Sequence, residues 1–512
     1  MTGKHLYKKT SQLMMVSLIG LFFTLQASAS NMPTDRHSLL VEFLRLTDKK
    51  PQWQDPQRLR SLEFGVKNLL NDGLEPSNYQ LKRIQQLINQ FDDQIPEISA
   101  AEDAVISGAY LEAIADLMLG RTRNSNVERY LNYQNQQPNA FAAIVQLAVT
   151  YLDEPSVAFD KARPQVQEYQ SLRTAHQRIL EQIQASPSLP LITPDRPSLR
   201  LGVIDPRVTL LRRHLGVEIP EIDSDVYDQD LMEAVRQFQS QQGLEADGIA
   251  GPQTFAHINR TPEQDLVAIR VNLERWRRVN LALTDSRVIA NIAGATIHYY
   301  QDNQLEFYSR TQVGRRDRPT PLMISEISHF TLNPTWTIPP TIYRNDKLPA
   351  IQNDPSYIQS NRLTVLDTQG NRLDPDLIDW DNPGSILLRQ SSGPHNALGQ
   401  VVIRFPNRQS IYLHDTPNQR LFDRNQRYFS SGCIRVEDAT LLVNKLLEAT
   451  HSAQASQFDS LLSSGSTRNI NIGQPVTIVL GYWTVNATPA GDIQVFTDIY
   501  GLDSAMLSAL NG

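Results

Sequence analysis

The sequence predicts a multidomain α+β protein with a helical scaffold, a small three-helix module and a mainly β domain that carries the functional site. Apolar residues recur at helical spacing over residues 37–184. A compact unit of short helices and tight turns follows at residues 199–260. From Val288 onward the pattern changes to short strands separated by glycine and proline turns. The chain has 512 residues, which is long enough for several domains.

The N-terminal segment has the pattern of an export signal. Lysines at positions 4, 8 and 9 precede an uncharged apolar run from Leu13 to Leu25, and Ala27-Ser28-Ala29 follows as a cleavage site. We therefore expect residues 1–29 to be a secretory signal peptide and the mature protein to be periplasmic. An uncleaved N-terminal anchor is the alternative, and membrane attachment is expected only in that case.

Residues 30–198 are predicted to form the helical scaffold. Gly120 follows the apolar run 104–119 and is a candidate helix C-cap. A segment with four prolines, 186–197, serves as a linker to the module. Residues 261–285 return to a helix, so we expect the scaffold helices on both sides of the module to pack together. The arginines of that helix are expected on a solvated face; they are Arg270, Arg275, Arg277 and Arg278.

Composition excludes some classes of partner. Apolar residues make up 40% and charged residues 20% of the chain, as in ordinary soluble globular proteins. The net charge is −7 and no basic stripe stands out, which argues against a nucleic-acid partner.

Cys433 is the single cysteine of the chain, so it has no intramolecular disulfide partner. Its presence is explained either by packing or by reactivity. Gly432 and the two serines before it indicate a loop rather than a core position. A helix is predicted over residues 439–447, and its positive N-terminal end would lower the pKa of a nearby thiol. Free backbone N–H groups there could also stabilise an oxyanion.

His414 is predicted on a strand that forms a hairpin with residues 401–405. Side chains alternate along a strand, so Ile411 and Leu413 share one face while Tyr412 and His414 share the other. This arrangement favours a site wall over an isolated structural histidine. Asp415 would point away from the imidazole, and we therefore expect a backbone carbonyl, not this carboxylate, to accept the second ring N–H.

The segment His414-Asp-Thr, followed by Ser430-Ser-Gly-Cys-Ile-Arg, resembles the L,D-transpeptidases, cysteine acyltransferases of the bacterial cell wall with the YkuD fold. The likeness is closest to the large, multidomain, Gram-negative YcbB-like subgroup and covers most of the chain after the first hundred residues. Ser431 occupies a position where the commoner pattern has a second histidine, which leaves His414 as the candidate base. Further matching segments are Val313-Gly-Arg, Thr320-Pro, Asn333-Pro-Thr-Trp, Asn396-Ala-Leu-Gly and Asp498-Ile-Tyr-Gly.

The resemblance extends to the other domains. Residues 199–260 resemble a peptidoglycan-binding module, in which most of the matching positions belong to core and turns, so binding itself stays open. Residues 286–512 would be the catalytic domain. Within it, residues 339–385 form a polar stretch without a clear core pattern, which suggests a capping lid rather than a second domain. Gly393 and Asn396, just after this stretch, could line the cleft.

The resemblance implies an acyl transfer through Cys433. Its thiolate would attack the carbonyl between the diamino acid and the terminal D-alanine of a tetrapeptide stem, with His414 as general base and then acid. The amine of an acceptor stem would then take the acyl group, giving a 3→3 cross-link, and carbapenems would acylate the same thiol. The residues expected to stabilise the oxyanion or bind the substrate are Tyr412, Ser431, Gly432, Arg435, Trp336 and Asn396.

No metal or organic cofactor is implied, because no His/Cys/Asp cluster has ligand spacing. Two alternatives stay open. One is an L,D-carboxypeptidase that uses the same site and passes the acyl group to water. The other is a non-catalytic wall-binding protein in which the thiol is inert.

Overall fold

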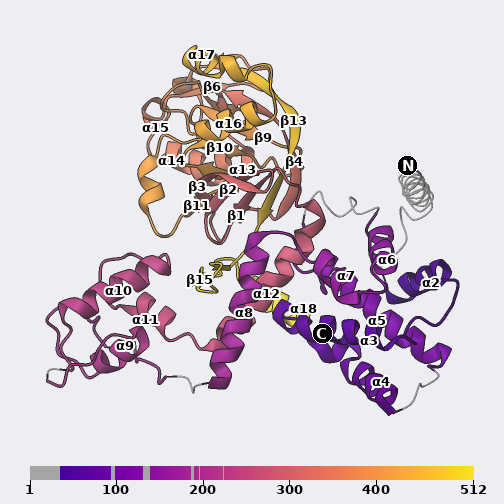
Figure 1. Cartoon of the computed structure of the whole chain (residues 1–512). Helices are drawn as coiled ribbons and strands as arrows, with labels where there is room; N and C mark the ends of the chain where they lie inside the picture. The colour runs from indigo at the N-terminus through magenta and orange to yellow at the C-terminus, as the bar shows by residue number, and fades with distance from the viewer. Residues whose placement is uncertain (1–34, 94–97, 131–138, 186–188, 195, 223) are drawn as a thin grey trace, which may run out of the picture.

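Figure 1 shows the computed structural model of the chain, which describes residues 35–93, 98–130, 139–185, 189–194, 196–222 and 224–512. The expected signal segment lies outside these residues. None of the described helices is long and apolar enough to cross a membrane. The predicted multidomain α+β architecture is confirmed, with a helical scaffold, a small helical module and a β-rich domain.

The helices of the N-terminal scaffold share one hydrophobic core. They are α2 (Arg36–Leu46), α3 (Pro56–Asn68), α4 (Leu81–Asp93), α5 (Ala100–Leu119), α6 (Ala140–Thr150) and α7 (Pro155–Ala162). The helix α5 runs through this core and is buried along nearly its whole second half. It ends at Gly120, whose φ of +87° favours glycine, and this is the C-cap that the sequence predicts. The turn between α3 and α4 contains two 3-10 helices, η1 (Leu69–Asp72) and η2 (Pro76–Tyr79).

Two helices that flank the module in sequence, α8 (Gln167–Ala185) and α12 (Pro262–Val279), pack against each other as expected (Figure 1). The helix α12 begins with a capping box in which Thr261 and Gln264 bond to each other's backbone N–H. It continues into η3 (Asn280–Ala282). Its Trp276 stacks on Trp483 of the β-rich domain with ring centroids 4.2 Å apart, so α12 joins the scaffold to that domain.

The expectation of a solvated arginine face on α12 is wrong for Arg275 and Arg277, whose side chains are fully buried. Arg275 pairs with Glu128 at 2.6 Å and with Asp503 at 2.7 Å. Arg277 pairs with Glu274 at 2.8 Å, and this carboxylate also accepts bonds from Thr122. Because α12 is covered by protein on several sides, its cations are balanced by buried carboxylates instead of water.

The small module consists of α9 (Arg207–Leu215), α10 (Gln229–Gln241) and α11 (Pro252–Ile258) around its own core. It contacts the β-rich domain through Gln242, at the end of α10. The Gln242 amide donates to the carbonyl of Ile493 at 3.1 Å and accepts from the amide of Val495 at 3.5 Å. Both partners lie in β15 (Ile493–Val495), which pairs with β14 (Val485–Ala487).

The β-rich domain contains a closed barrel, because the last strand of its sheet, β2, also pairs with β3. The strand order is β11-β3-β12-β10-β9-β4-β13-β1-β2. The barrel strands are β1 (Arg287–Asn291), β2 (Thr296–Gln301), β3 (Gln304–Gly314), β4 (Met323–Leu332), β9 (Val401–Arg404), β10 (Leu413–His414), β11 (Tyr428–Ser430), β12 (Ile434–Val436) and β13 (Arg468–Gly481). Helix α16 (Ala439–Ala449) packs its buried leucines on β9 and β13.

Shorter helices complete this domain. They are η6 (Gln419–Asp423), η7 (Ala455–Gln457), α17 (Phe458–Ser463) and α18 (Asp503–Asn511). The last of these packs back on α12, so the C-terminus lies next to the scaffold (Figure 1).

The segment between β4 and β9 is a folded subdomain, which we call the cap (residues 336–390). It has a four-stranded sheet in the order β5-β8-β6-β7 and a small hydrophobic core that includes Ile351, Ile358 and Val365. The sequence shows no clear core pattern over this stretch, yet the structure gives it a core. Its apolar residues are spread over short elements, which hides their period. These elements are β5 (Trp336–Thr337), α13 (Pro340–Ile342), the π-helical turn η4 (Tyr343–Lys347), α14 (Leu348–Asn353), α15 (Tyr357–Ser360), β6 (Leu363–Leu366), β7 (Arg372–Leu373), η5 (Pro375–Leu377) and β8 (Leu387–Gln390).

Candidate active site

The pairing of β10 with β9 and β12 decides which side chains meet at the site. His414 lies opposite Val402 of β9 and beside Arg435 of β12. A hydrogen bond from the Ile434 amide to the Tyr412 carbonyl, 3.2 Å long, continues the parallel ladder one residue toward the loop. The register therefore places Tyr412 beside the residue that precedes Ile434, which is Cys433.

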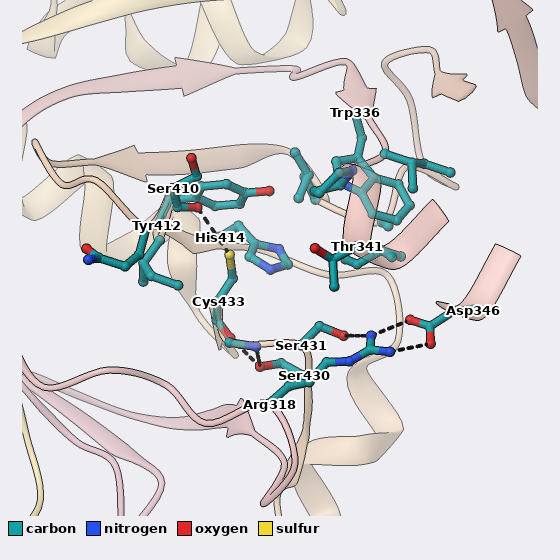
Figure 2. A pocket seen from close by; sticks show the side chains of 18 of the residues that line it. Arg318, Trp336, Thr341, Asp346, Ser410, Tyr412, His414, Ser430, Ser431 and Cys433 are labelled. Atoms are coloured by element: carbon teal, nitrogen blue, oxygen red, sulfur yellow. Dashed lines mark hydrogen bonds and ion pairs between the residues drawn. The ribbon is translucent and has the colours of Figure 1, made fainter. Parts of the chain in front are cut away.

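Cys433 and His414 are thus diagonal neighbours on adjacent strands. Strand spacing and rise put the Cα atoms of such neighbours about 8 Å apart, and side chains pointing to one face can bridge that separation. Tyr412 shares the face, with its ring centroid 5.7 Å from that of His414, while Leu413 between them is fully buried in the core. The predicted alternation is confirmed, and Figure 2 shows the three polar side chains reaching into one pocket.

The loop that carries Cys433 is held by hydroxyl groups. Ser430 Oγ donates to the Cys433 carbonyl at 2.5 Å and accepts from the Gly432 amide at 3.1 Å. Thr320 Oγ1 donates to the Gly432 carbonyl at 2.8 Å. Gly432 has φ +116°, a conformation that favours glycine. The Gly432 N–H is directed to Ser430 and is not free for an oxyanion, which corrects that part of the sequence hypothesis.

The predicted effect of a helix N-terminus on Cys433 is wrong. The helix α16 begins at Ala439, and strand β12 separates it from the thiol. Burial raises the pKa of the Cys433 thiol, and hydrogen bonds from Tyr412 oppose this only in part. The thiol lies 3.8 Å from the carbonyl of Ser410, to which S–H can donate. At neutral pH the resting group is therefore a thiol rather than a thiolate.

His414 is buried, and its ring is fixed by the backbone of the next residue. Nδ1 lies 2.6 Å from the carbonyl oxygen of Asp415. A carbonyl can only accept, so Nδ1 carries the proton and Nε2 keeps its lone pair. The Asp415 carbonyl is thus the backbone acceptor that the sequence predicts for the second ring N–H. Burial, and next the charge of Arg435, lower the pKa of His414 to about 3, so the imidazole is neutral at physiological pH.

The Asp415 carboxylate points away from the imidazole, also as predicted. Oδ1 accepts from the Thr416 amide at 2.7 Å and Oδ2 from the Gln400 amide at 2.8 Å. Asp415 therefore ties the end of β10 to the turn before β9, and it reaches His414 only through its own backbone.

Tyr412 links the cap to the thiol. Hydrogen bonding with the Trp336 side chain of β5 and with the Cys433 side chain contributes to the pKa of its phenol. Burial and the neighbouring sulfur raise the pKa of Tyr412, which keeps the phenol protonated and able to donate. A fixed donor beside the nucleophile is suited to stabilise negative charge that develops next to it.

The pocket around these residues has a volume of about 1000 Å³ and lies between the barrel and the cap. Cations outnumber carboxylates on its wall. The charged residues that line it are Arg315, Arg318, Lys347, Arg404, Arg435 and Asp346. The pocket is therefore suited to a ligand that carries carboxylates.

An ion pair connects the cap to the thiol loop across this pocket. The Arg318 guanidinium holds the Asp346 carboxylate of η4 with two bonds of 2.7 and 2.9 Å. The same guanidinium donates to Ser431 Oγ at 3.2 Å, and Figure 2 shows the three side chains in line. The cap is thus connected to a residue two places before Cys433.

Comparison with known proteins gives the family of each domain. Residues 285–478 match the L,D-transpeptidase catalytic domain of the YkuD family, and residues 38–175 match a scaffold domain. The chain carries a YkuD-type L,D-transpeptidase domain. Residues 210–258 match a provisionally described peptidoglycan binding domain. The domain families of the sequence resemblance are thereby confirmed.

One relative is a protein of Haemophilus influenzae, named provisionally as an L,D-transpeptidase. It is 37% identical over 222 residues, which are 42% of this chain and 44% of the relative. The matched region thus spans less than half of that relative. The solved structures include an L,D-transpeptidase from Stackebrandtia nassauensis, with 13% identity, a TM-score of 0.22 and coverage of 56% of this chain and 97% of that chain. Another is an L,D-transpeptidase from Mycobacterium smegmatis, with 14% identity, a TM-score of 0.19 and coverage of 38% and 58%.

The expected cleft residues of the transpeptidase domain separate into two groups. Trp336, Ser431 and Arg435 line the catalytic pocket. Asn396 lies instead among the lining residues of a different hollow, together with Gly393. Its side-chain amide donates to the carbonyls of Pro334 and Ser391, both at 2.9 Å, so the buried Asn396 side chain stabilises the loop conformation. The expectation that Asn396 lines the cleft is therefore wrong.

Three residues that line the transpeptidase pocket are missing from the sequence prediction: Arg318, Asp346 and Arg404. Arg318 and Asp346 lie in separate polar stretches, and nothing in their spacing indicates that they meet. Arg404 is different, because it belongs to the predicted hairpin. The sequence leaves the register of that hairpin open, and the structure shows the register, which pairs Arg404 with Tyr412.

We expect the alkylation rate of Cys433 by neutral iodoacetamide to rise about tenfold per pH unit and to level off only above the pKa of an ordinary cysteine. The reason is that burial raises the pKa of this thiol. Tyr412→Phe should shift the curve to still higher pH, since the hydroxyl that lowers the thiol pKa is lost. Intact-mass kinetics from pH 6 to 10 check this. A rate plateau below pH 8 would instead indicate a thiolate–imidazolium pair.

Proposed function

We propose that this chain is a peptidoglycan L,D-transpeptidase that forms 3→3 cross-links through a Cys433 acyl-enzyme. The observation that supports this best is the strand register. It brings the single thiol, a neutral imidazole and a phenol donor to one wall of a cation-lined pocket within the transpeptidase domain. Peptidoglycan stems carry carboxylates and a free side-chain amine, which fits such a pocket.

In the first half-reaction, His414 Nε2 takes the proton of the Cys433 thiol as the sulfur attacks the carbonyl of the diamino acid. The Tyr412 hydroxyl and the Cys433 amide are the candidate donors to the oxyanion. The tetrahedral intermediate then collapses, the C–N bond to the terminal D-alanine breaks, and His414 returns its proton to the departing amine. A thioester and free D-alanine result.

In the second half-reaction, the side-chain amine of an acceptor stem attacks the thioester. His414 Nε2 accepts a proton from that amine, the C–S bond breaks, and the sulfur leaves as thiolate and recovers the proton. Since the imidazole is neutral at rest, it can act as a base at the start of each half-reaction. The product is an amide between two diamino acids.

Mass spectrometry of the purified protein with tetrapeptide stems tests this proposal. The expected result is loss of D-alanine, a transient acyl adduct on Cys433 and a cross-linked dimer of stems. A tripeptide product without dimer would favour the L,D-carboxypeptidase. No turnover and no adduct would favour the non-catalytic wall-binding protein.

We further propose that the protein acts in the periplasm after export. This rests on the positive segment, the apolar run and the Ala27-Ser28-Ala29 site at the N-terminus. Fractionation of cells that express the full chain tests it, since a cleaved periplasmic form should begin after Ala29. A membrane-bound, uncleaved form would instead support the anchor alternative.

The peptidoglycan-binding module is expected to concentrate the enzyme on its polymeric substrate. Deleting residues 200–260 should lower activity on intact sacculi by about tenfold or more while sparing soluble stems, because a tethered site loses its effective-concentration advantage. Gln242→Ala is the matched control, since it removes only the docking contact with β15. Assays on both substrates, with thermal unfolding of each variant, check this. Equal loss on both substrates would mean that the module supports the catalytic domain itself.

A further inference from the structure

Two of the pocket arginines have no carboxylate partner among the described residues. Arg318 is bound by Asp346, and Arg315 pairs with Asp317 at 2.9 Å. Arg404 has no such ion pair, and its one hydrogen bond is a long contact from Nε to Thr331 Oγ1 at 3.5 Å. The second is Arg435, whose Nη1 donates to Gln312 at 3.0 Å. A half-buried guanidinium normally has an anionic or hydrogen-bonding partner. A carboxylate supplied by a ligand would be such a partner for these arginines.

Arg404 is held close to the reacting sulfur. The strand register places it beside Tyr412, and its guanidinium lies 4.8 Å from the centre of the Tyr412 ring. The register of β10 and β12 in turn places Tyr412 beside Cys433. The guanidinium is therefore about one strand spacing, roughly 5 Å, from the side chain that lies beside the nucleophile. Stacking on the ring fixes the direction in which its free N–H groups point.

The charge of Arg404 is unfavourable for the empty site. It contributes to lowering the pKa of the buried His414 imidazole, which weakens the general base. A carboxylate bound to Arg404 would neutralise this charge and remove its contribution to the lowered pKa of His414, while burial and Arg435 would still act. The charge of Arg404 also lowers the pKa of the Cys433 thiol, so a bound carboxylate would act on the base and on the nucleophile together.

We propose that Arg404 binds a carboxylate of the donor stem and thereby selects stems in which that carboxylate is free. This inference rests on the proposed transpeptidase function. Two carboxylates are candidates: one lies a single residue beyond the attacked carbonyl, and a residue spans at most about 3.6 Å, while the other lies at the end of the flexible side chain of the attacked residue. One is the terminal carboxylate of D-alanine, and the other is the free carboxylate on the side chain of the diamino acid.

Acylation rates of Cys433 on three soluble stems test the proposal. The stems have both carboxylates free, the terminal one as amide, or the diamino-acid one as amide. One of the two amidated stems should acylate wild-type Cys433 about 10- to 100-fold more slowly than the stem with both carboxylates free, the range expected for a charge-assisted hydrogen bond. Arg404→Gln should remove the difference in rate between the free stem and that same amidated stem. The position of the amide in that stem identifies the carboxylate that Arg404 binds. Arg404→Lys should keep part of it, since the charge remains but the planar fork is lost.

Arg408→Gln is the matched control, because Arg408 is exposed in the turn of the same hairpin and does not line the catalytic pocket. It should leave all three rates unchanged. Equal slowing of all stems by Arg404→Gln would mean that the residue acts through Tyr412 and Cys433, and unchanged preference would mean that another group binds the carboxylate. Either result overturns the inference but leaves the proposed function standing. No acyl-enzyme on Cys433 of the wild type with any stem would remove the proposed function and the inference together.

Discussion

Cys433→Ala is expected to abolish cross-linking and to remove every covalent adduct. The chain has one cysteine, and the described pocket offers no second thiol. Loss of a nucleophile that forms the intermediate removes the reaction path rather than slowing one step of it. The measurement is the intact mass of wild type and variant after incubation with a tetrapeptide stem and, separately, with a carbapenem. Wild type should gain one adduct of each kind, and the variant none.

The exchange is small enough to isolate chemistry from folding. Cys433 is only half-buried, so removing its sulfur should change the thermal midpoint little. A stem adduct of equal yield on the alanine variant would locate the nucleophile elsewhere. If the variant gains a carbapenem adduct but no stem adduct, the drug reacts at a second site.

His414→Ala is expected to lower the single-turnover acylation rate by at least about 1000-fold. The imidazole serves as base toward the thiol and as acid toward the leaving amine, and each role is typically worth about 10²–10⁴. The loss should be large because the resting thiol has a raised pKa and needs a base to become nucleophilic. Rapid-quench mass spectrometry on the same stem peptide measures it.

Asp415→Asn is the control, with turnover expected within about tenfold of wild type, or about 1.4 kcal/mol. The imidazole keeps its partner, because that partner is the backbone carbonyl of residue 415. The amide would leave one of the two backbone N–H groups that face the carboxylate without its acceptor, so a loss of stability of about 1–3 kcal/mol is expected. A folded Asp415→Asn protein as inactive as His414→Ala would require a role for the carboxylate in the reaction.

Alternation and local turn chemistry were sufficient to predict much of this protein. The period of two in residues 411–414 determines that Tyr412 and His414 share a face, and a backbone constraint of this kind depends only on neighbours in the chain. The same alternation directs the Asp415 carboxylate away from the imidazole. Helical periods located the scaffold helices, and a terminal glycine located the C-cap of α5 at Gly120.

Properties that depend on contacts between distant segments were decided by the tertiary structure alone. The thiol pKa rises because the surrounding protein shields the Cys433 sulfur from water, whereas sequence proximity to α16 predicted a fall. Arg275 is buried and paired with Glu128 and Asp503, which come from distant parts of the chain and meet it only in the fold. Burial and pairing depend on everything packed around a group, and a one-dimensional pattern contains only its covalent neighbours.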